Sequence, residues 1–459
     1  MLEDKQKNQL SLINRFSMIY HVIAPKVNFH SFFLLACLFL MVLSFGDVIA
    51  QDHDYGYPIT NPLAATVVGT PIDYQGDLGQ PVAFEKHEFK VFSDRKTPNY
   101  FWYNDKITYG LMRQETKAPL VFVIAGTGGN YSGPKISAIS RILFNQGFHV
   151  VSLPSPTFMS FIIAASRTAV PGLLDDDSHD LYNVMKLVWQ IDLKDQIEVS
   201  DFFVTGYSLG GAQAAYVAYI DEEQKFFDFK KVLVMNSPVS LLNSVSILDG
   251  YVDNFAPDGK LGVHFSDFWK DTWSMLSRRY SQSQSGNIQL GPDFLFELYK
   301  DRDLDDKSLE RLIATVFRIS AASLVFTSDV MSQSGFIVPK GKELKITENV
   351  TSYSVISHRT SFNEYAEQLM LPYYQSQDES ITFDDLVMRA SLYPIEDYLR
   401  ESDKIGLMHN EDDIIMAPGE MDWFRDVFGD RAKIYPYGGH LGNVVYKDNI
   451  EYMIAFFKK

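Results

Sequence analysis

Short runs of consecutive apolar residues recur along the chain, each bounded by polar or turn-forming residues. Strands covered on both faces have this pattern, because neither side of the sheet meets water. Two earlier segments, 87–92 and 99–114, alternate apolar and polar residues instead, which is typical of antiparallel strands. The pattern therefore predicts a mainly parallel sheet with antiparallel strands at its start. The predicted buried strands are 119–126, 148–154, 201–206, 230–238, 404–410 and 432–438.

Segments with helical periodicity separate these strands. In residues 178–191 the apolar positions fall on one face, and Asp177 or Ser178 is the expected N-cap. Residues 209–219 are rich in alanine, which lets a helix lie close to a sheet. Strands that alternate with helices predict the α/β class and a doubly wound sheet. The expected helices are 135–146, 178–191, 209–219, 418–428 and 443–457.

The alternation stops between residues 238 and 403. An irregular loop of that length is not expected inside a compact domain. Several amphipathic segments occur there, among them 309–319 and 362–371. The stretch is therefore predicted to be a large, mostly helical cap inserted into the sheet domain.

Composition narrows the functional classes. Hydrophobic residues make up 46% of the chain and charged residues 22%, which is typical of a folded globular protein. The formal net charge of −17 repels a phosphate backbone, so nucleic acid is excluded as an expected partner. The single cysteine, Cys37, lies in the N-terminal apolar segment, so disulfides and cysteine-based metal sites are not expected in the rest.

The N-terminus carries the pattern of an export signal. Residues 32–45 form an apolar run of about 14 residues, which fits a signal-peptide core and is short for a membrane span. Basic residues precede the run, and Val48-Ile49-Ala50 resembles a cleavage site. We expect residues 1–50 to be a signal peptide and the protein to be periplasmic or extracellular, with an uncleaved membrane anchor as the alternative. Residues 51–83 are expected to form an extended lead-in.

A candidate nucleophile lies at the junction of a predicted strand and helix. The segment Gly206-Tyr207-Ser208-Leu209-Gly210-Gly211 contains the pattern G-x-S-x-G. Such a turn forces the serine into a strained conformation, and its neighbours two residues away must lack side-chain bulk for the turn to close. The pattern G-x-S-x-G is a more specific signal here than the five residues alone, because a predicted strand precedes it and a predicted helix follows it.

Together, the ordered strands, this elbow and the C-terminal Gly438-Gly439-His440 resemble the α/β-hydrolase superfamily. The resemblance covers residues 84–240 and 404–459 and leaves the lead-in and the cap at 241–403 unassigned. It implies a serine nucleophile, an acid and a base in that chain order, with acid and base on loops after later strands.

Only two histidines follow the cap, and this leaves two candidates for the base. His409 lies inside a predicted strand, whereas His440 lies in a glycine-rich turn after the last strand. A turn of this kind suits the presentation of an imidazole, so His440 is the predicted base.

The acid is expected just after the strand at 404–410. Family members carry a Gly-x-x-Asp-x-x-Val-Pro-like pattern there, and the resemblance sets Asn410 at the glycine and Met416 at the valine. This register makes Asp413 the predicted acid. Asp412 and Glu411 remain as alternatives, because those two departures allow the register to slip. The carboxylate would hold the imidazole and stabilise the imidazolium.

Two backbone N–H groups are needed for an oxyanion hole. Leu209, directly after the nucleophile, is expected to give one. The resemblance implies that Thr127, in the loop after the strand at 119–126, gives the other. Ala125 replaces the family's histidine in this loop, which leaves Thr127 and Gly128 both open as the donor.

These features predict a serine hydrolase of the esterase or lipase type that acts through an acyl-enzyme and needs no metal or organic cofactor. The expected substrate is a small-molecule or lipid-like ester; the cap, the aromatic content and the apolar loop at 158–165 favour an apolar acyl chain. A peptidase of the prolyl-oligopeptidase type and a non-catalytic binding protein are the alternatives. The sequence does not determine the oligomeric state.

Overall fold

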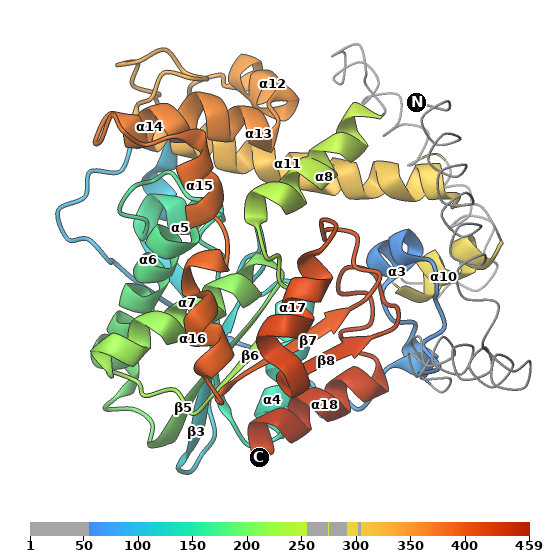
Figure 1. Cartoon of the computed structure of the whole chain (residues 1–459). Coiled ribbons are helices and arrows are strands. Elements are labelled where there is room, and N and C mark those ends of the chain that lie inside the picture. Colours follow the sequence, from blue (N-terminus) through green and yellow to red (C-terminus); the bar gives the residue numbers. More distant parts are fainter. Residues whose placement is uncertain (1–54, 255–273, 275–291, 302–303) are drawn as a thin grey trace, which may run out of the picture. The chain divides into compact units, whose positions relative to one another are not determined.

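A computed structural model of the chain describes residues 55–254, 274, 292–301 and 304–459 (Figure 1). The predicted signal peptide lies outside these residues and stays a prediction. Within the described part, no helix combines the length and the apolar character needed to cross a bilayer.

One sheet organises the described residues. Its eight strands have the order β1-β2-β4-β3-β5-β6-β7-β8, in which β2 runs antiparallel to its neighbours and the strands from β3 to β8 run parallel to one another. This confirms the predicted doubly wound, mainly parallel sheet. The strands are β1 (Glu85–Phe89), β2 (Ile107–Met112), β3 (Ala118–Ile124), β4 (His149–Leu153), β5 (Val199–Tyr207), β6 (Lys231–Met235), β7 (Ile405–Asn410) and β8 (Ala432–Tyr435).

Alternate side chains of the central strands enter two separate apolar cores. Phe122 and Ile124 of β3 belong to one core, and Val121 and Val123 of the same strand belong to the other. The first core includes α6 (Leu174–Leu187), α7 (Leu209–Gln224) and α17 (Glu420–Phe428), and the second includes α4 (Pro134–Asn145) and α18 (Lys447–Lys458). Coverage on both faces explains why these strands are apolar along their whole length.

Two predicted elements differ from the structure. Residues Asn99–Asn104, predicted as part of a strand, form a 3₁₀ helix in which Phe101 is buried against Phe326. The aromatic residues there favour a strand by propensity, but this packing determines the conformation instead. Helix α6 begins at Leu174, not after Asp177 or Ser178, and has no side-chain N-cap. Three aspartates in its first turn suit the positive end of the helix dipole.

Between β6 and β7 the described residues form several helices and no named strand, and irregular segments such as 333–350 connect the helices. This agrees with the predicted helical insertion. Figure 1 shows α8 and the long α11 at the top of the view together with α12, α13 and α14. The helices are α8 (Leu241–Asp253), α10 (Pro292–Lys300), α11 (Asp306–Ser332), α12 (Thr351–Arg359), α13 (Phe362–Tyr365), α14 (Leu371–Gln375), α15 (Phe383–Arg389) and α16 (Glu396–Glu401).

The segment expected to be an extended lead-in contains a helix, α3 (Pro62–Val68). Asn61 caps this helix by accepting a hydrogen bond from the Ala64 amide at 2.9 Å, and Pro62 occupies its first turn. Buried residues of α3 pack in the second core, and the helix also contacts α10 and α11. The lead-in is therefore part of the folded domain.

The register of the sheet brings five strand ends to one edge. Ile124 pairs with Gly206, Tyr207 with Met235, Met235 with Met408, and Asn410 with Tyr435. Because these strands are parallel, the loops that follow β3, β5, β6, β7 and β8 leave the sheet side by side. Every predicted site residue lies in one of these loops or directly after it.

Candidate active site

Ser208 lies at the sharp turn between β5 and α7. Its backbone has φ 55° and ψ −132°, a region that costs a residue other than glycine about 1–3 kcal/mol. A side chain at Gly206 would place Cβ 2.0 Å from the Gly210 carbonyl oxygen, and one at Gly210 would lie 2.4 Å from the Ile124 oxygen. The turn therefore closes only with glycine at both positions, as the motif predicts, and it carries Ser208 beyond the end of the strand.

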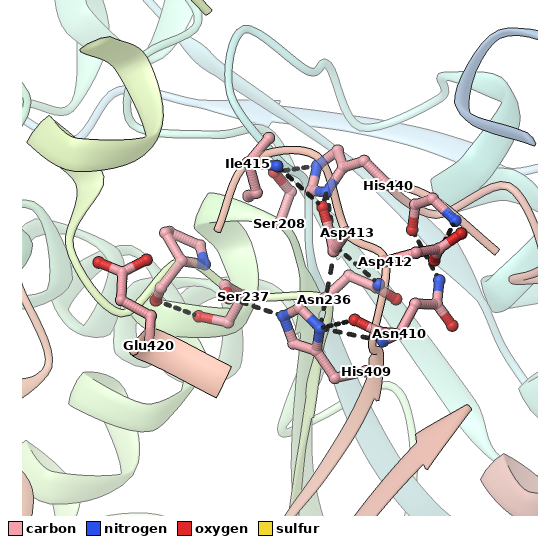
Figure 2. A network of polar contacts seen from close by, with 12 residues as sticks. Ser208, Asn236, Ser237, His409, Asn410, Asp412, Asp413, Ile415, Glu420 and His440 are labelled. Carbon is pink, nitrogen blue, oxygen red and sulfur yellow. Dashed lines mark hydrogen bonds and ion pairs between the residues drawn. The ribbon is translucent and has the colours of Figure 1, made fainter. Parts of the chain in front are cut away.

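His440 faces Ser208 from the loop after β8. The imidazole Nε2 lies 2.9 Å from the Ser208 hydroxyl oxygen, so the hydroxyl can donate its proton to the ring. The other ring nitrogen, Nδ1, lies 3.0 Å from both carboxylate oxygens of Asp413 (Figure 2). The structure thus brings the three predicted residues into one hydrogen-bonded chain from three distant parts of the sequence.

The Asp413 carboxylate is fully buried and accepts three kinds of hydrogen bond. Besides His440, the Asn236 amide nitrogen lies 2.9 Å away and the Ile415 backbone N–H lies 3.2 Å away. Burial by itself would raise the pKa of Asp413, but attraction to His440 and these hydrogen bonds outweigh it, so the pKa is lowered. The carboxylate therefore stays ionised beside the imidazole.

Asp412, the alternative acid, has a different position. Its carboxylate accepts the Gly439 backbone N–H at 2.8 Å and forms no hydrogen bond or ion pair with the His440 imidazole (Figure 2). Burial raises its pKa to about 6, although hydrogen bonds from Gly439 and Gly438 act in the opposite direction. Glu411, the other alternative, forms an exposed ion pair with Arg425. Asp413 is the carboxylate that the fold presents to His440.

His409, the alternative base, is buried beside Asp413 but turned toward β6. The Asn410 backbone N–H donates to its Nδ1 at 3.0 Å, and its Nε2 lies 3.0 Å from the Ser237 carbonyl oxygen. This arrangement suits the tautomer that carries its proton on Nε2. His409 therefore supports the acid loop from within the sheet.

A buried group of amide side chains, which we did not predict, holds the loop of His440. The Asn410 amide nitrogen donates to the Gly439 carbonyl oxygen at 2.7 Å and to Asn443 at 2.9 Å. Asn443 donates back to the Asn410 side-chain oxygen at 2.6 Å and also to the Tyr55 hydroxyl. In the sequence, only the position of Asn410 at the end of a predicted strand hinted at a role in the site. Its partners could not be predicted, because Tyr55 and Asn443 lie far from it in the chain.

Helix α3 fixes the same loop from the other side. The backbone N–H of His440 donates to the Thr66 hydroxyl oxygen at 2.8 Å. A side chain at Gly439, whose φ is +55°, would lie 2.2 Å from the Pro62 carbonyl oxygen. The glycine therefore allows the loop to pass directly over α3. Nothing in the sequence around Thr66 predicts this contact.

The loop after β3 supplies the candidate oxyanion donors. The Gly128 backbone N–H donates to the Thr157 hydroxyl at 2.8 Å and is already used. This leaves Thr127, of the two donors that the sequence left open, and Thr127 lines the same cavity as Ser208 and Leu209. Leu209 is the first residue of α7, where a backbone N–H has no acceptor within its own helix.

Ser208 and His440 open into a cavity of about 450 Å³. Apolar side chains of the insertion form a large part of its described wall, while Thr66 and Val67 of α3 form another part. Residues 158–165, predicted to favour an apolar substrate from a loop, form helix α5 (Met159–Ala164) within the core and are not among the lining residues. The lining residues of α8, α10 and α11 are Leu241, Ser244, Val245, Leu248, Leu295, Leu312, Ile313, Val316, Phe317 and Ser320.

Within the residues that the structure describes, no group of three or more His, Cys, Asp and Glu side chains could hold a metal ion.

Comparison with the known sequence families and with curated proteins gives no match. Among solved structures, Est1E from Butyrivibrio proteoclasticus is similar over 77% of this chain and 96% of its own, at 12% identity and a TM-score of 0.34. A hyperthermophilic esterase from the archaeon Pyrobaculum calidifontis is similar over 86% and 87%, at 13% identity and a TM-score of 0.37. The acylaminoacyl peptidase of Pyrococcus horikoshii is similar over 82% of this chain and 42% of its own, at 12% identity and a TM-score of 0.37.

Proposed function

We propose that this chain, which has the α/β-hydrolase fold, is a serine hydrolase that cleaves carboxylic esters with an apolar acyl chain. The order and direction of its own eight strands support the fold, independently of any sequence match. The observation that carries the proposed activity is the hydrogen-bonded chain from Ser208 through His440 to Asp413 at an apolar cavity.

Each residue has a definite role in the proposed reaction. Ser208 Oγ attacks the ester carbonyl carbon while His440 Nε2 takes the hydroxyl proton, and the backbone N–H groups of Leu209 and Thr127 hold the oxygen that becomes negative. The tetrahedral intermediate collapses, the alcohol leaves with the proton from His440, and Ser208 remains acylated. A water molecule, activated by the same imidazole, then releases the carboxylic acid. Asp413 stays ionised throughout and stabilises the imidazolium.

The strained backbone of Ser208 supports this role. A serine with φ 55° destabilises the fold, and such backbone strain occurs mainly at functional sites. The burial of Asp413 supports it as well, because an ionised carboxylate in an apolar interior needs a partner that can become positive. His440 provides that partner.

A fluorophosphonate probe tests the proposal directly, since it reacts only with an activated serine. We expect the wild-type protein to be labelled, Ser208→Ala to abolish labelling, and His440→Ala to slow it by at least about 10³-fold. Ser237→Ala is the control, because Ser237 is buried and its hydroxyl donates to the Pro238 carbonyl. Labelling that survives Ser208→Ala contradicts the assignment of the nucleophile.

The two alternative functions give other outcomes. A folded wild-type protein that is not labelled at all would favour a non-catalytic binding protein. Labelling at Ser208 together with faster cleavage of p-nitroanilide peptides than of p-nitrophenyl esters would favour a peptidase.

A further inference from the structure

One charged side chain in the cavity has no role in the reaction described above. Lys135, the second residue of helix α4, lines the same cavity as Ser208 and His440. Among the described residues that line this cavity there is no aspartate, glutamate or arginine. Lys135 therefore borders a space whose other described lining side chains are mostly apolar, with several hydroxyl groups and the His440 imidazole.

An unpaired ammonium group in such a place is costly. Lysine is almost never withdrawn from water without a partner, because its charge loses hydration that the protein must replace. In the described part of the chain, Lys135 has neither a hydrogen bond nor an ion pair. Asp413 attracts it, but that carboxylate is already bound by His440 and Asn236. Burial lowers the pKa of Lys135, against the attraction of Asp413.

The surroundings of Lys135 add to the local positive potential. The first turn of α4 contains no acidic residue, and its N-cap, Gly133, has no side chain that could accept the helix N–H groups. Helix α4 itself therefore has no acidic or capping side chain at the positive end of its dipole. The chain as a whole has a formal net charge of −17, whereas the described lining of this cavity contains a lysine and no carboxylate.

We propose that Lys135 binds an anionic group of the substrate. The substrates of this enzyme are then amphiphilic esters, with an apolar chain against α8 and α11 and a carboxylate, phosphate or sulfonate-like group that pairs with Lys135. This inference rests on the proposed esterase function and adds the charge of the substrate to it. The anion would form a charge-assisted hydrogen bond with the ammonium group, which has no such partner in the described protein.

Matched pairs of esters test this inference. Each pair compares a neutral ester with one that carries a negative charge, on the acyl side in one pair and on the alcohol side in the other. For the acyl side, p-nitrophenyl hexanoate is compared with mono-p-nitrophenyl adipate, which carries a terminal carboxylate. For the alcohol side, 2-nitrophenyl hexanoate is compared with its derivative that bears a sulfonate para to the ester oxygen. The measured quantity is the ratio of kcat/KM for the charged ester to kcat/KM for the neutral ester.

In at least one pair, we expect Lys135→Met to lower this ratio by about tenfold or more, as for the loss of a hydrogen bond to a charged group. Lys135→Arg keeps the charge and should lower it by less than about threefold. The control is Lys96→Met, which removes the same charge from an exposed position outside the cavity and should leave the ratio unchanged. The pair that responds identifies the side on which the anion binds.

Other results would overturn the inference. Equal losses for the charged and the neutral ester in Lys135→Met would mean that Lys135 acts on the shared reaction, for example on the oxyanion. An unchanged ratio in both pairs would mean that Lys135 binds no part of the substrate. Failure of the wild type to hydrolyse any of the esters, without probe labelling, would contradict the proposed function itself.

A second measurement needs no variant and covers the case in which Lys135→Met does not fold. Decanoate and decyltrimethylammonium have apolar chains of similar length and opposite charge. As competitive inhibitors of the wild type against p-nitrophenyl hexanoate, decanoate should bind at least about tenfold more tightly. Equal inhibition, or tighter binding of the cation, would overturn the inference.

Discussion

Two neighbouring aspartates, Asp412 and Asp413, differ in their contacts and in the direction of their pKa shifts. Asp413 holds the imidazole of His440 at 3.0 Å, whereas Asp412 accepts the Gly439 backbone N–H at 2.8 Å. The two carboxylates have opposite pKa shifts, lowered for Asp413 and raised to about 6 for Asp412. The difference arises because only Asp413 faces a group that can carry positive charge.

This difference predicts distinct effects of two isosteric substitutions. Asp413→Asn replaces an acceptor with an amide that cannot stabilise the imidazolium, and we expect kcat for p-nitrophenyl hexanoate to fall by about 10⁴-fold. Asp412→Asn can still accept the Gly439 N–H, and kcat should fall by less than about tenfold. Steady-state kinetics on both variants, with folding checked by circular dichroism, measure the contrast. A larger loss for Asp412→Asn would reverse the assignment of the acid.

At the scale of elements, helix α3 is a structural part of the site although it precedes the sheet in the chain. It supplies the acceptor for the backbone N–H of His440 and two residues of the cavity wall, Thr66 and Val67. The close approach of Gly439 to the Pro62 carbonyl leaves the His440 loop little room to move. The loop is therefore held between α3 on one side and the Asn410 and Asn443 amides on the other.

Removal of the Thr66 hydroxyl should loosen the His440 loop. Thr66→Val keeps the side-chain volume but leaves the His440 N–H without its acceptor, at a cost of about 1–2 kcal/mol. We expect kcat to fall by about tenfold with little change in KM, because the imidazole is displaced while the substrate cavity is retained. Thr66→Ser, which keeps the hydroxyl, should restore most of kcat. A rise in KM without loss of kcat would instead assign Thr66 to substrate binding.

At the scale of the whole domain, the cavity exists only because the insertion meets the sheet. Ser208 and His440 come from the edge of the sheet, and about half of the described apolar lining residues come from α8, α10 and α11. The buried ion pair between Asp249 of α8 and Arg318 of α11, at 3.0 Å, joins two of these helices. The sheet edge therefore carries Ser208 and His440, and the insertion lines much of the cavity beside them. In the proposed function, this part of the wall selects the substrate.

The apolar wall predicts a dependence on acyl-chain length. From p-nitrophenyl acetate to the hexanoate, kcat/KM should rise by about two- to fourfold per methylene group, as expected for apolar burial. Leu248→Trp fills part of the cavity and should reduce kcat/KM for the hexanoate much more than for the acetate. Ile191→Trp, at a position that is 63% exposed, is the matched control. A flat chain-length profile in the wild type would mean that the acyl chain does not enter this cavity.

The sequence by itself predicted the parallel sheet, the helical insertion, and the positions of Ser208 and His440, and it placed the acid within residues 411–413. These follow from local signals, because burial on both faces makes a strand apolar throughout and a tight elbow requires glycine at 206 and 210. Only the tertiary structure shows that Asp413 and not Asp412 contacts His440, that the Gly128 N–H is already bonded to Thr157, and that the expected lead-in contains the helix that holds His440. It also placed Thr66, Asn443 and Lys135 at the site. These contacts join segments up to several hundred residues apart, so no pattern within either segment contains them.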